Sequence, residues 1–247
     1  MNTIITCTDN SLAPEIAAVC QRILTREAQG QPIICVSQKP VDFGVNVCVG
    51  EIGRSWTSLY KQVLAGIEAA PTDWVVITEH DCLYTHEHLS YRPADAGVFH
   101  YNTNCWLVEG PGGNHPELFG MYSYWPQRLA FSQLICDKHL LKASIEERLN
   151  ILEHGGTMDR NFLGYGEPGV ISKRALKMVK DYADSGRPVR LQPYLEKYLT
   201  SYEHKAFRTV NPNLDIRHNS NFSGPKRGKK RTYELEPWGK FEDVMNG

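Results

Sequence analysis

Two carboxylates and an imidazole directly follow an apolar run of the chain. Residues 74–78, "WVVIT", read as a buried strand, and Glu79, His80 and Asp81 come next. Alternate residues of an extended strand end point to the same side, so we expect Glu79 and Asp81 to face one ligand and His80 to point away. Two close carboxylates repel unless a cation or a shared proton intervenes. The triplet therefore predicts a site for a hard divalent ion, Mg²⁺ or Mn²⁺; the alternative is a solvated turn.

Three residues near the beginning of the chain could contact an anionic or polar ligand. Thr8 and Asp9 follow the first apolar run, where they either bind a ligand or cap the helix expected to begin near Pro14. Arg54 precedes a strongly patterned helix, and a guanidinium beside a helix N-terminus is well placed for a phosphate. An exposed surface arginine is the alternative reading of Arg54.

Further candidates lie in the second half of the chain. The imidazole of His218 suits Mn²⁺, and the ammonium of Lys226 could neutralise a diphosphate. Asp159 and Glu167 stand in the glycine-rich stretch "GGTMDRNFLGYGEPG", where either could act as a general base. Each of these residues could also be an ordinary loop residue.

The basic run "KRGKKR", residues 226–231, has three readings. It is a solvated segment, a loop that closes over a diphosphate, or a clamp on the phosphates of a nucleic acid. The net charge of −1 argues against broad affinity for nucleic acids but not against a local clamp. The cluster "EHDCLYTHEH" lacks the second ligand pair of a structural zinc site, so we expect no zinc there.

The elements that position these residues follow from the hydrophobic pattern. Apolar runs predict strands, and spacings of three and four predict helices, over segments 3–8, 11–30, 32–37, 45–50, 55–70 and 73–78 in the order strand, helix, strand, strand, helix, strand. Continuous apolar strands are typical of a sheet covered on both faces. We therefore expect an α/β fold with a mostly parallel central sheet flanked by helices, which binds ligands beyond the carboxyl ends of its strands.

The second half of the chain is more variable in pattern. A hairpin is expected over residues 96–110, helices over 128–156 and 172–186, a strand over 204–211, and a polar tail after it. No linker divides the chain, so we expect one domain, 1–247. The seven cysteines form no CxxC pair, no apolar run could span a membrane, and the first ten residues are too polar for a signal peptide, so we expect a cytoplasmic protein.

Residues 1–85 resemble nucleotide-sugar glycosyltransferases of the GT-A fold. The resemblance rests on "RSWTSLYKQVLAGIEAAPTDWVVITEHD", which ends like the Asp-x-Asp signature of that family, with Glu79 in place of the first aspartate. It implies that Asp81 ligates the metal, that Glu79 contacts the ribose or reaches the metal through water, and that Thr8 and Asp9 hold the base and ribose. It further implies a UDP-sugar donor bound by half 1–85 and an acceptor half 86–247 with a C-terminal metal and phosphate loop.

The tail adds a second resemblance. His218, Gly224 and Lys226, with a displaced "PW" after them, resemble the His-x-x-Gly-x-x-Lys-Pro-Trp motif of a retaining branch of the family. This implies that His218 is a metal ligand and Lys226 a diphosphate contact. Asp159 and Glu167 instead resemble the position of the base in inverting members, so the stereochemical outcome stays open.

The acceptor also stays open at this point. The tail resembles bacteriophage glycosyltransferases that decorate hydroxymethylated DNA bases, and a glycan or lipopolysaccharide is the alternative acceptor. A nucleotidyltransferase with the same sheet is a second class, although "TCTDNSLAPE" lacks the glycine-rich basic loop expected after its first strand. A non-catalytic sugar- or nucleotide-binding protein is the third.

Overall fold

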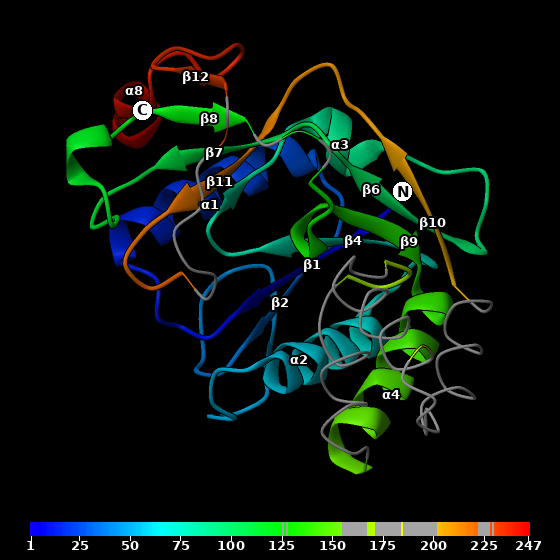
Figure 1. Ribbon diagram of the computed structural model, residues 1–247. Helices are drawn as coiled ribbons and strands as arrows, with labels where there is room; N and C mark the ends of the chain where they lie inside the picture. The colour runs from blue at the N-terminus through cyan, green and yellow to red at the C-terminus, as the bar shows by residue number, and fades with distance from the viewer. Residues whose placement is uncertain are drawn as a thin grey trace.

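The computed structural model describes residues 1–124, 126, 128–154, 167–170, 184, 202–221, 228 and 230–247. Its central element is a seven-stranded sheet with the strand order β10-β6-β9-β4-β1-β2-β3 (Figure 1). The strands are β1 (Thr3–Thr8), β2 (Ile33–Ser37), β3 (Val45–Cys48), β4 (Trp74–Glu79), β6 (Val98–Asn102), β9 (Leu134–Asp137) and β10 (Glu203–Phe207). Only β9 runs antiparallel to its neighbours in this sheet, so the expected mostly parallel α/β sheet is confirmed.

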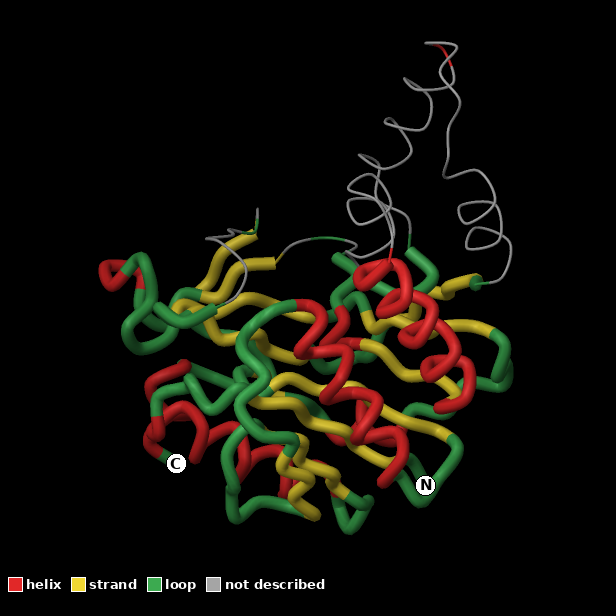
Figure 2. Tube along the Cα trace, turned by 90° about the horizontal axis from the view of Figure 1, so that it is seen from below, coloured by secondary structure: helices red, strands yellow, loops and turns green. Residues whose placement is uncertain are grey.

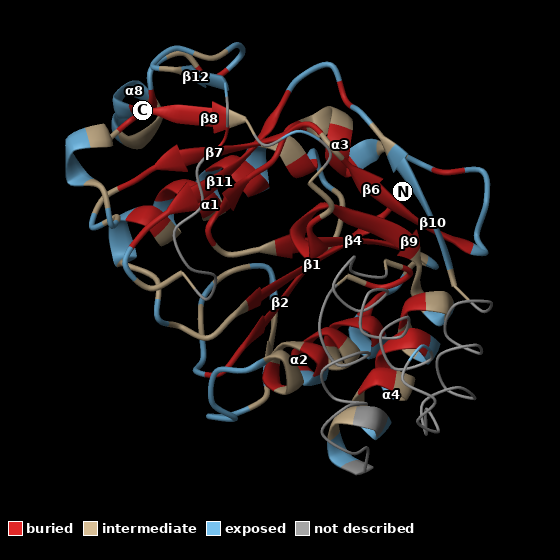
Figure 3. Ribbon diagram, in the orientation of Figure 1, coloured by how far each residue is buried: buried red, intermediate tan, exposed pale blue. Residues whose placement is uncertain are grey.

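Helices cover both faces of this sheet. Helices α2 (Trp56–Ala69) and α4 (Lys138–His154) pack on one face, and Figure 2 views the molecule from their side. Helix α1 (Pro14–Ala28) lies on the other face, together with the short α3 (His86–Ser90). The central strands β1, β4, β6 and β9 are buried, whereas the edge strand β10 and the outer sides of the helices are largely exposed (Figure 3).

The alternation of side chains along β1 decides which layer each one packs against. Ile5 and Cys7 belong to the core cluster that contains Tyr60 and Val63 of α2. Ile4 belongs to a different cluster, which includes Leu24 of α1. Because successive strand residues point to opposite faces, one apolar strand supplies both cores.

A second, five-stranded sheet lies beside the first. Its order is β12-β8-β7-β11-β5, with the strands β5 (Cys82–Leu83), β7 (Cys105–Glu109), β8 (Tyr122–Tyr124), β11 (Asn213–Arg217) and β12 (Lys230–Thr232). Helix α1 packs on this sheet as well, through a cluster that also holds Phe241 of α8 (Phe241–Asn246). The short helices η1 (Pro116–Leu118) and η2 (Phe131–Gln133) complete the described elements.

The predicted hairpin over 96–110 is wrong. Its two apolar pieces form strands β6 and β7, but β6 pairs with β9 and β10, and β7 pairs with β8 and β11 in the other sheet. The side chain of Asn102 donates to Thr209 Oγ1 at 2.9 Å, and that of Asn104 donates to Thr209 O at 3.0 Å. These bonds tie the turn to a distant segment and send the two strands into different sheets.

Five of the described strands, β5, β8, β9, β11 and β12, were not predicted. The segment "LICD" forms β9 directly before α4, within a stretch in which the pattern indicated helix. The segment "NLDIR" forms the fully buried β11, within the expected polar tail. The helix expected over 11–30 begins at Pro14, three residues after Ser11. Ser11 therefore does not cap it, and its backbone amide and hydroxyl both donate to Asp9 Oδ1. The helix expected over 172–186 lies almost wholly outside the described residues.

Candidate metal and substrate site

A cavity of about 210 Å³ opens beyond the carboxyl ends of β1 and β4. Five residues singled out from the sequence line it: Asp9, Arg54, Glu79, Asp81 and Glu167. In an open parallel sheet this edge is where ligands bind, because the loops that follow neighbouring strands converge there. The cavity is therefore the candidate functional site.

Strand pairing brings His218 to Asp81. Strand β11 pairs antiparallel with β5, and the amide of Ile216 donates to Asp81 O at 2.9 Å. The residue after β11, His218, then places Nε2 3.2 Å from Asp81 Oδ2. The Asn221 amide donates to the same oxygen at 2.9 Å. Burial opposes ionisation of Asp81, but the hydrogen bond from His218 and the neighbouring imidazoles outweigh it and lower the pKa of this carboxyl.

The other ring nitrogen of His218 is also bonded. Its Nδ1 lies 2.9 Å from the hydroxyl of Ser220 and accepts from the Ser220 amide at 3.3 Å. The His218 side chain is only 2% exposed, so its orientation is determined by these contacts. A histidine held through one nitrogen can present the other to a metal, which is how metal-binding imidazoles are commonly oriented.

Glu79 is the second carboxylate of the site. One ligand atom from each of Glu79, Asp81 and Cys82 can be chosen so that all three lie within 4.8 Å of one another. Burial, and then the neighbouring carboxylates of Asp81 and Asp215, raise the pKa of Glu79 to about 8. The same two causes raise the pKa of the Cys82 thiol well above its usual range, which favours the neutral thiol when no metal is bound.

His80 does not point away from the site, contrary to the strand-end geometry expected from the sequence. Strand β4 ends at Glu79, and His80 and Asp81 form the turn into β5. His80 lines the cavity, and its Nδ1 lies 2.7 Å from Thr8 Oγ1 and 3.9 Å from Asp9 Oδ1. Burial lowers the pKa of His80 despite the nearby carboxylates, which favours the neutral imidazole.

Asp9 and Arg54 face each other across one end of the cavity. Arg54 Nε lies 2.8 Å from Asp9 Oδ2, and the Arg54 guanidinium also donates to the carbonyl of Ser220. This arginine precedes α2, which is capped by Ser55 through a 3.0 Å bond from the Ser58 amide. Arg54 thus joins the start of α2 to the segment that carries His218.

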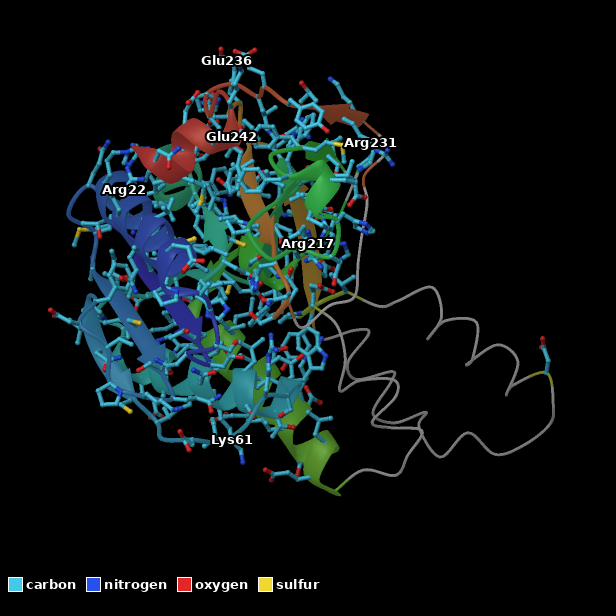
Figure 4. The ribbon with its side chains drawn as sticks, turned by 90° about the vertical axis from the view of Figure 1, so that its left-hand side faces the viewer. Arg22, Lys61, Arg217, Arg231, Glu236 and Glu242 are labelled. Carbon is cyan, nitrogen blue, oxygen red and sulfur yellow. The ribbon has the colours of Figure 1, made fainter. Side chains whose placement is uncertain are left out.

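Sequence reasoning missed several cavity residues, four of which take part in ion pairs or hydrogen bonds that involve an acidic residue of the cavity lining. These four are Arg128, Asp215, Arg217 and Asn221. Arg128 Nη1 lies 2.7 Å from Asp215 Oδ2, and Arg217 Nη1 lies 3.5 Å from Asp215 Oδ1. Figure 4 shows Arg217 in the middle of the molecule, whereas the labelled Arg22 and Glu236 lie at its outline. The alternation in "NLDIR", with Leu214 and Ile216 in the core, was the available signal that Asp215 and Arg217 share the opposite face.

Four other residues were singled out from the sequence: Thr8, Asp159, Glu167 and Lys226. Glu167 lines the cavity, and its negative charge contributes to the raised pKa of Glu79. Thr8 contacts the site through His80. Asp159 and Lys226 lie outside the described residues.

The donor set around Asp81 fits a divalent cation. Two carboxylates and an imidazole are ligands that Mn²⁺ accepts, and Mg²⁺ suits the carboxylates. Asp81 Oδ2 accepts hydrogen bonds from His218 and Asn221, and a cation bound there would take the place of a donor. The residues that could bind such an ion are Asp81, the nearby Glu79 and, through its contact with Asp81, His218.

No protein-family model and no curated protein matches the chain. Among solved structures it is similar to a glycosyltransferase involved in the glycosylation of the major capsid of PBCV-1, at 12% identity and a TM-score of 0.41, over 86% of this chain and 92% of that one. It is similar to the glycosyltransferase GlyE of Streptococcus pneumoniae at 10% identity and a TM-score of 0.41, over 83% of this chain but 45% of that one. A Drosophila β-1,4-galactosyltransferase 7 in complex with manganese, UDP-Gal and xylobiose shares 10% identity, with a TM-score of 0.39, over 100% and 79% of the two chains. At these values the likenesses establish no activity for this chain.

Among the described residues, no helix combines the length and the apolarity needed to cross a membrane.

Proposed function

We propose that the protein is a divalent-metal-dependent glycosyltransferase that moves a sugar from a nucleotide-sugar donor to an acceptor hydroxyl. The observation that carries this proposal is that Asp81, in the lining of the cavity beyond β1 and β4, lies close to Glu79 and is in contact with His218. Burial, and then repulsion by Asp81 and Asp215, raises the pKa of Glu79, and a bound cation would relieve both effects.

Asp81 and His218, with Glu79 directly or through water, would bind Mn²⁺ or Mg²⁺ and with it the donor diphosphate. The ion would stabilise negative charge on the departing nucleotide. Arg54 provides a fixed positive charge at the other end of the cavity, and Lys226 would supply another from the tail. Thr8 and Asp9, at the end of β1, would contact the nucleoside of a UDP-sugar.

Glu167 is the proposed general base for the acceptor hydroxyl in an inverting transfer, because its position in the cavity wall meets the first requirement, access. Asp159 stays an alternative base from the same stretch of sequence. The Arg128–Asp215 pair lines the same cavity, and its charges would orient sugar hydroxyls.

The proposed donor site is not confined to residues 1–85. Asp215, Arg217 and Asn221 line the same cavity as Asp9 and Glu79. We therefore propose that the donor site includes residues of both halves, 1–85 and 86–247.

For the acceptor we propose a hydroxymethylated base in phage DNA. Support comes from the basic run, of which Lys230 and Arg231 are described and exposed. A phosphate backbone bound by these cations would position a base for transfer. A glycan acceptor would leave these cations without a function in transfer.

The decisive experiment is a screen of nucleotide diphosphates and nucleotide sugars, with and without Mn²⁺, by thermal unfolding. A ligand that binds only the folded state at 100 times its Kd adds about 2.7 kcal/mol to the unfolding free energy. We expect stabilisation by a nucleotide sugar only when Mn²⁺ is present, together with slow hydrolysis of that sugar in the absence of acceptor. A nucleotidyltransferase would instead release pyrophosphate from a nucleoside triphosphate and a sugar phosphate. Stabilisation without any turnover would indicate a binding protein.

A further inference from the structure

The segment 167–170 carries the cavity residue Glu167, and three of its successive backbone carbonyl groups accept hydrogen bonds from side chains. Arg148 Nη2 donates to Glu167 O at 2.9 Å, and the Tyr101 hydroxyl donates to Pro168 O at 2.6 Å. His204 Nδ1 donates to Gly169 O at 2.9 Å. The three donors come from α4, β6 and β10, so residues 167–170 are fastened to three separate elements.

Two of the three donors, Arg148 and Tyr101, are polar side chains that lie in the protein interior. Arg148 is 1% exposed and Tyr101 is 0% exposed, and a buried guanidinium lowers stability unless its donors are satisfied. A second Arg148 nitrogen donates to the hydroxyl of Tyr60 at 3.1 Å. The fold thus uses one of its largest fully buried side chains to hold a loop backbone in place.

The backbone of the segment is itself shaped for close approach. The amide of Val170 donates to Glu167 O at 3.1 Å and closes a turn. Gly169 has a φ of +72°, and a Cβ added there would lie 2.9 Å from the Phe99 ring and 3.1 Å from Glu203 O. Only glycine fits this position without displacing β6 or β10.

The side chain that this segment presents to the cavity is Glu167. Glu167 lines the same cavity as Glu79 and Asp81, and its negative charge contributes to the raised pKa of Glu79, Tyr60 and Tyr101. A loop backbone bound at three consecutive positions cannot rotate this residue out of the cavity wall without breaking several hydrogen bonds at once.

We propose that Tyr101, Arg148 and His204 are positioning residues that fix the backbone of Glu167 so that its carboxylate meets the acceptor in a single orientation. The catalytic part of this inference rests on the proposed function, in which Glu167 is the general base. Positioning of a reacting group contributes strongly to rate, and a displacement of about 1 Å can lower turnover about 100-fold.

The first test measures the segment itself and needs no activity. Amide hydrogen exchange of Val170 is followed in the wild type, in Tyr101→Phe and in the exposed-site variant His204→Ala. Loss of one carbonyl bond should speed exchange about fivefold, while Ile77 in β4 keeps its protection. The control is Tyr122→Phe, because the Tyr122 hydroxyl is buried without a hydrogen-bond partner among the described residues. If Tyr101→Phe and His204→Ala both leave the exchange rate of the Val170 amide unchanged, the proposal is overturned, whatever the activity of the protein.

The second test is a double-mutant cycle in sugar transfer. Tyr101→Phe should lower kcat about tenfold with the donor KM unchanged, and should have no further effect in the Glu167→Gln background. An equal loss in both backgrounds would mean that Tyr101 does not act through Glu167, and would overturn its positioning role. Full activity of Glu167→Gln would instead remove the base assignment from the proposed function and leave the exchange result standing.

Discussion

His218 and Asp81 are separated by 137 residues in the chain, yet His218 Nε2 lies 3.2 Å from Asp81 Oδ2. Both side chains are nearly inaccessible, with exposures of 2% and 11%. The contact depends on the pairing of β5 with β11, because that pairing aligns the turn after β4 with the end of β11. The proposed metal site therefore exists only in the folded chain, and the following predictions test it.

Asp81→Asn should abolish sugar transfer and remove the effect of Mn²⁺ on UDP binding. The amide keeps the size of the side chain but lacks the charge that binds the cation, so we expect at least about a 100-fold loss of Mn²⁺-supported affinity. Isothermal titration with UDP, with and without Mn²⁺, measures it. Asp42→Asn, at an exposed loop position, is the matched control. Full metal-free activity of the Asp81 variant would show that the acidic triplet is structural.

His218→Ala should weaken Mn²⁺-supported donor binding by about 10- to 100-fold and affect acceptor binding less. The imidazole contacts Asp81 directly and contacts no other carboxylate among the described residues. Mn²⁺ titration in the presence of UDP measures the change, and His139→Ala removes an exposed imidazole as the control. Equal Mn²⁺ affinities in the two variants would exclude His218 as a ligand.

Glu79 should make the metal-free protein less stable as the pH rises toward 8. The pKa of this carboxyl is about 8 in the folded state and 4.5 ordinarily, so between these values the folded state binds a proton that the unfolded state has lost. The unfolding free energy should therefore fall by at most about 1.4 kcal/mol per pH unit across this window. Denaturant titrations of Glu79→Gln should lack this fall. Parallel pH profiles for the two proteins would contradict the assignment.

His88 should have the opposite effect on the acid side. It stacks between Tyr84 and Phe207, and burial lowers its pKa to about 3 from the ordinary 6.5. Below pH 6.5 His88 binds a proton in the unfolded chain but stays neutral in the folded state. The unfolding free energy is therefore highest above pH 6.5 and decreases as the pH falls. From pH 7 to 5 the contribution is about 2 kcal/mol. His88→Phe keeps an aromatic ring and should lose this dependence, whereas His139→Phe should retain it.

The basic run should respond to salt if DNA is the acceptor. Each phosphate that is neutralised on a duplex contributes about −0.9 to the log–log salt slope of binding. Lys230→Ala combined with Arg231→Ala should flatten this slope by up to about two phosphates' worth and leave donor hydrolysis unchanged. Lys39→Ala with Lys61→Ala is the charge-matched control, and Figure 4 shows Lys61 and Arg231 at opposite ends of the molecule. A loss of donor affinity with an unchanged slope would show that the run closes over the diphosphate instead.

The local sequence pattern was enough to predict the strands and helices in the first part of the chain. The apolar runs before Asp9 and Glu79 predicted β1 and β4, and the stripe between Trp56 and Ile67 predicted α2. These predictions succeed because a buried strand and an amphipathic helix are each encoded by neighbouring residues. Glu79 and Asp81 are adjacent to one strand, so their proximity also followed from the sequence.

Only the tertiary structure decided what completes the site. β11 is a buried strand inside a polar tail, and its pairing with β5 and β7 places Asp215 and Arg217 in the cavity. The partner of Asp215, Arg128, comes from another part of the chain, at a separation of 87 residues. The pKa of Glu79 likewise depends on carboxylates brought together by folding. Pairing between strands distant in sequence leaves no periodic trace in either strand, so spacing alone cannot indicate which residues meet. The sequence determined the elements of the first 80 residues and one acidic pair, and long-range sheet pairing determined the rest of the site.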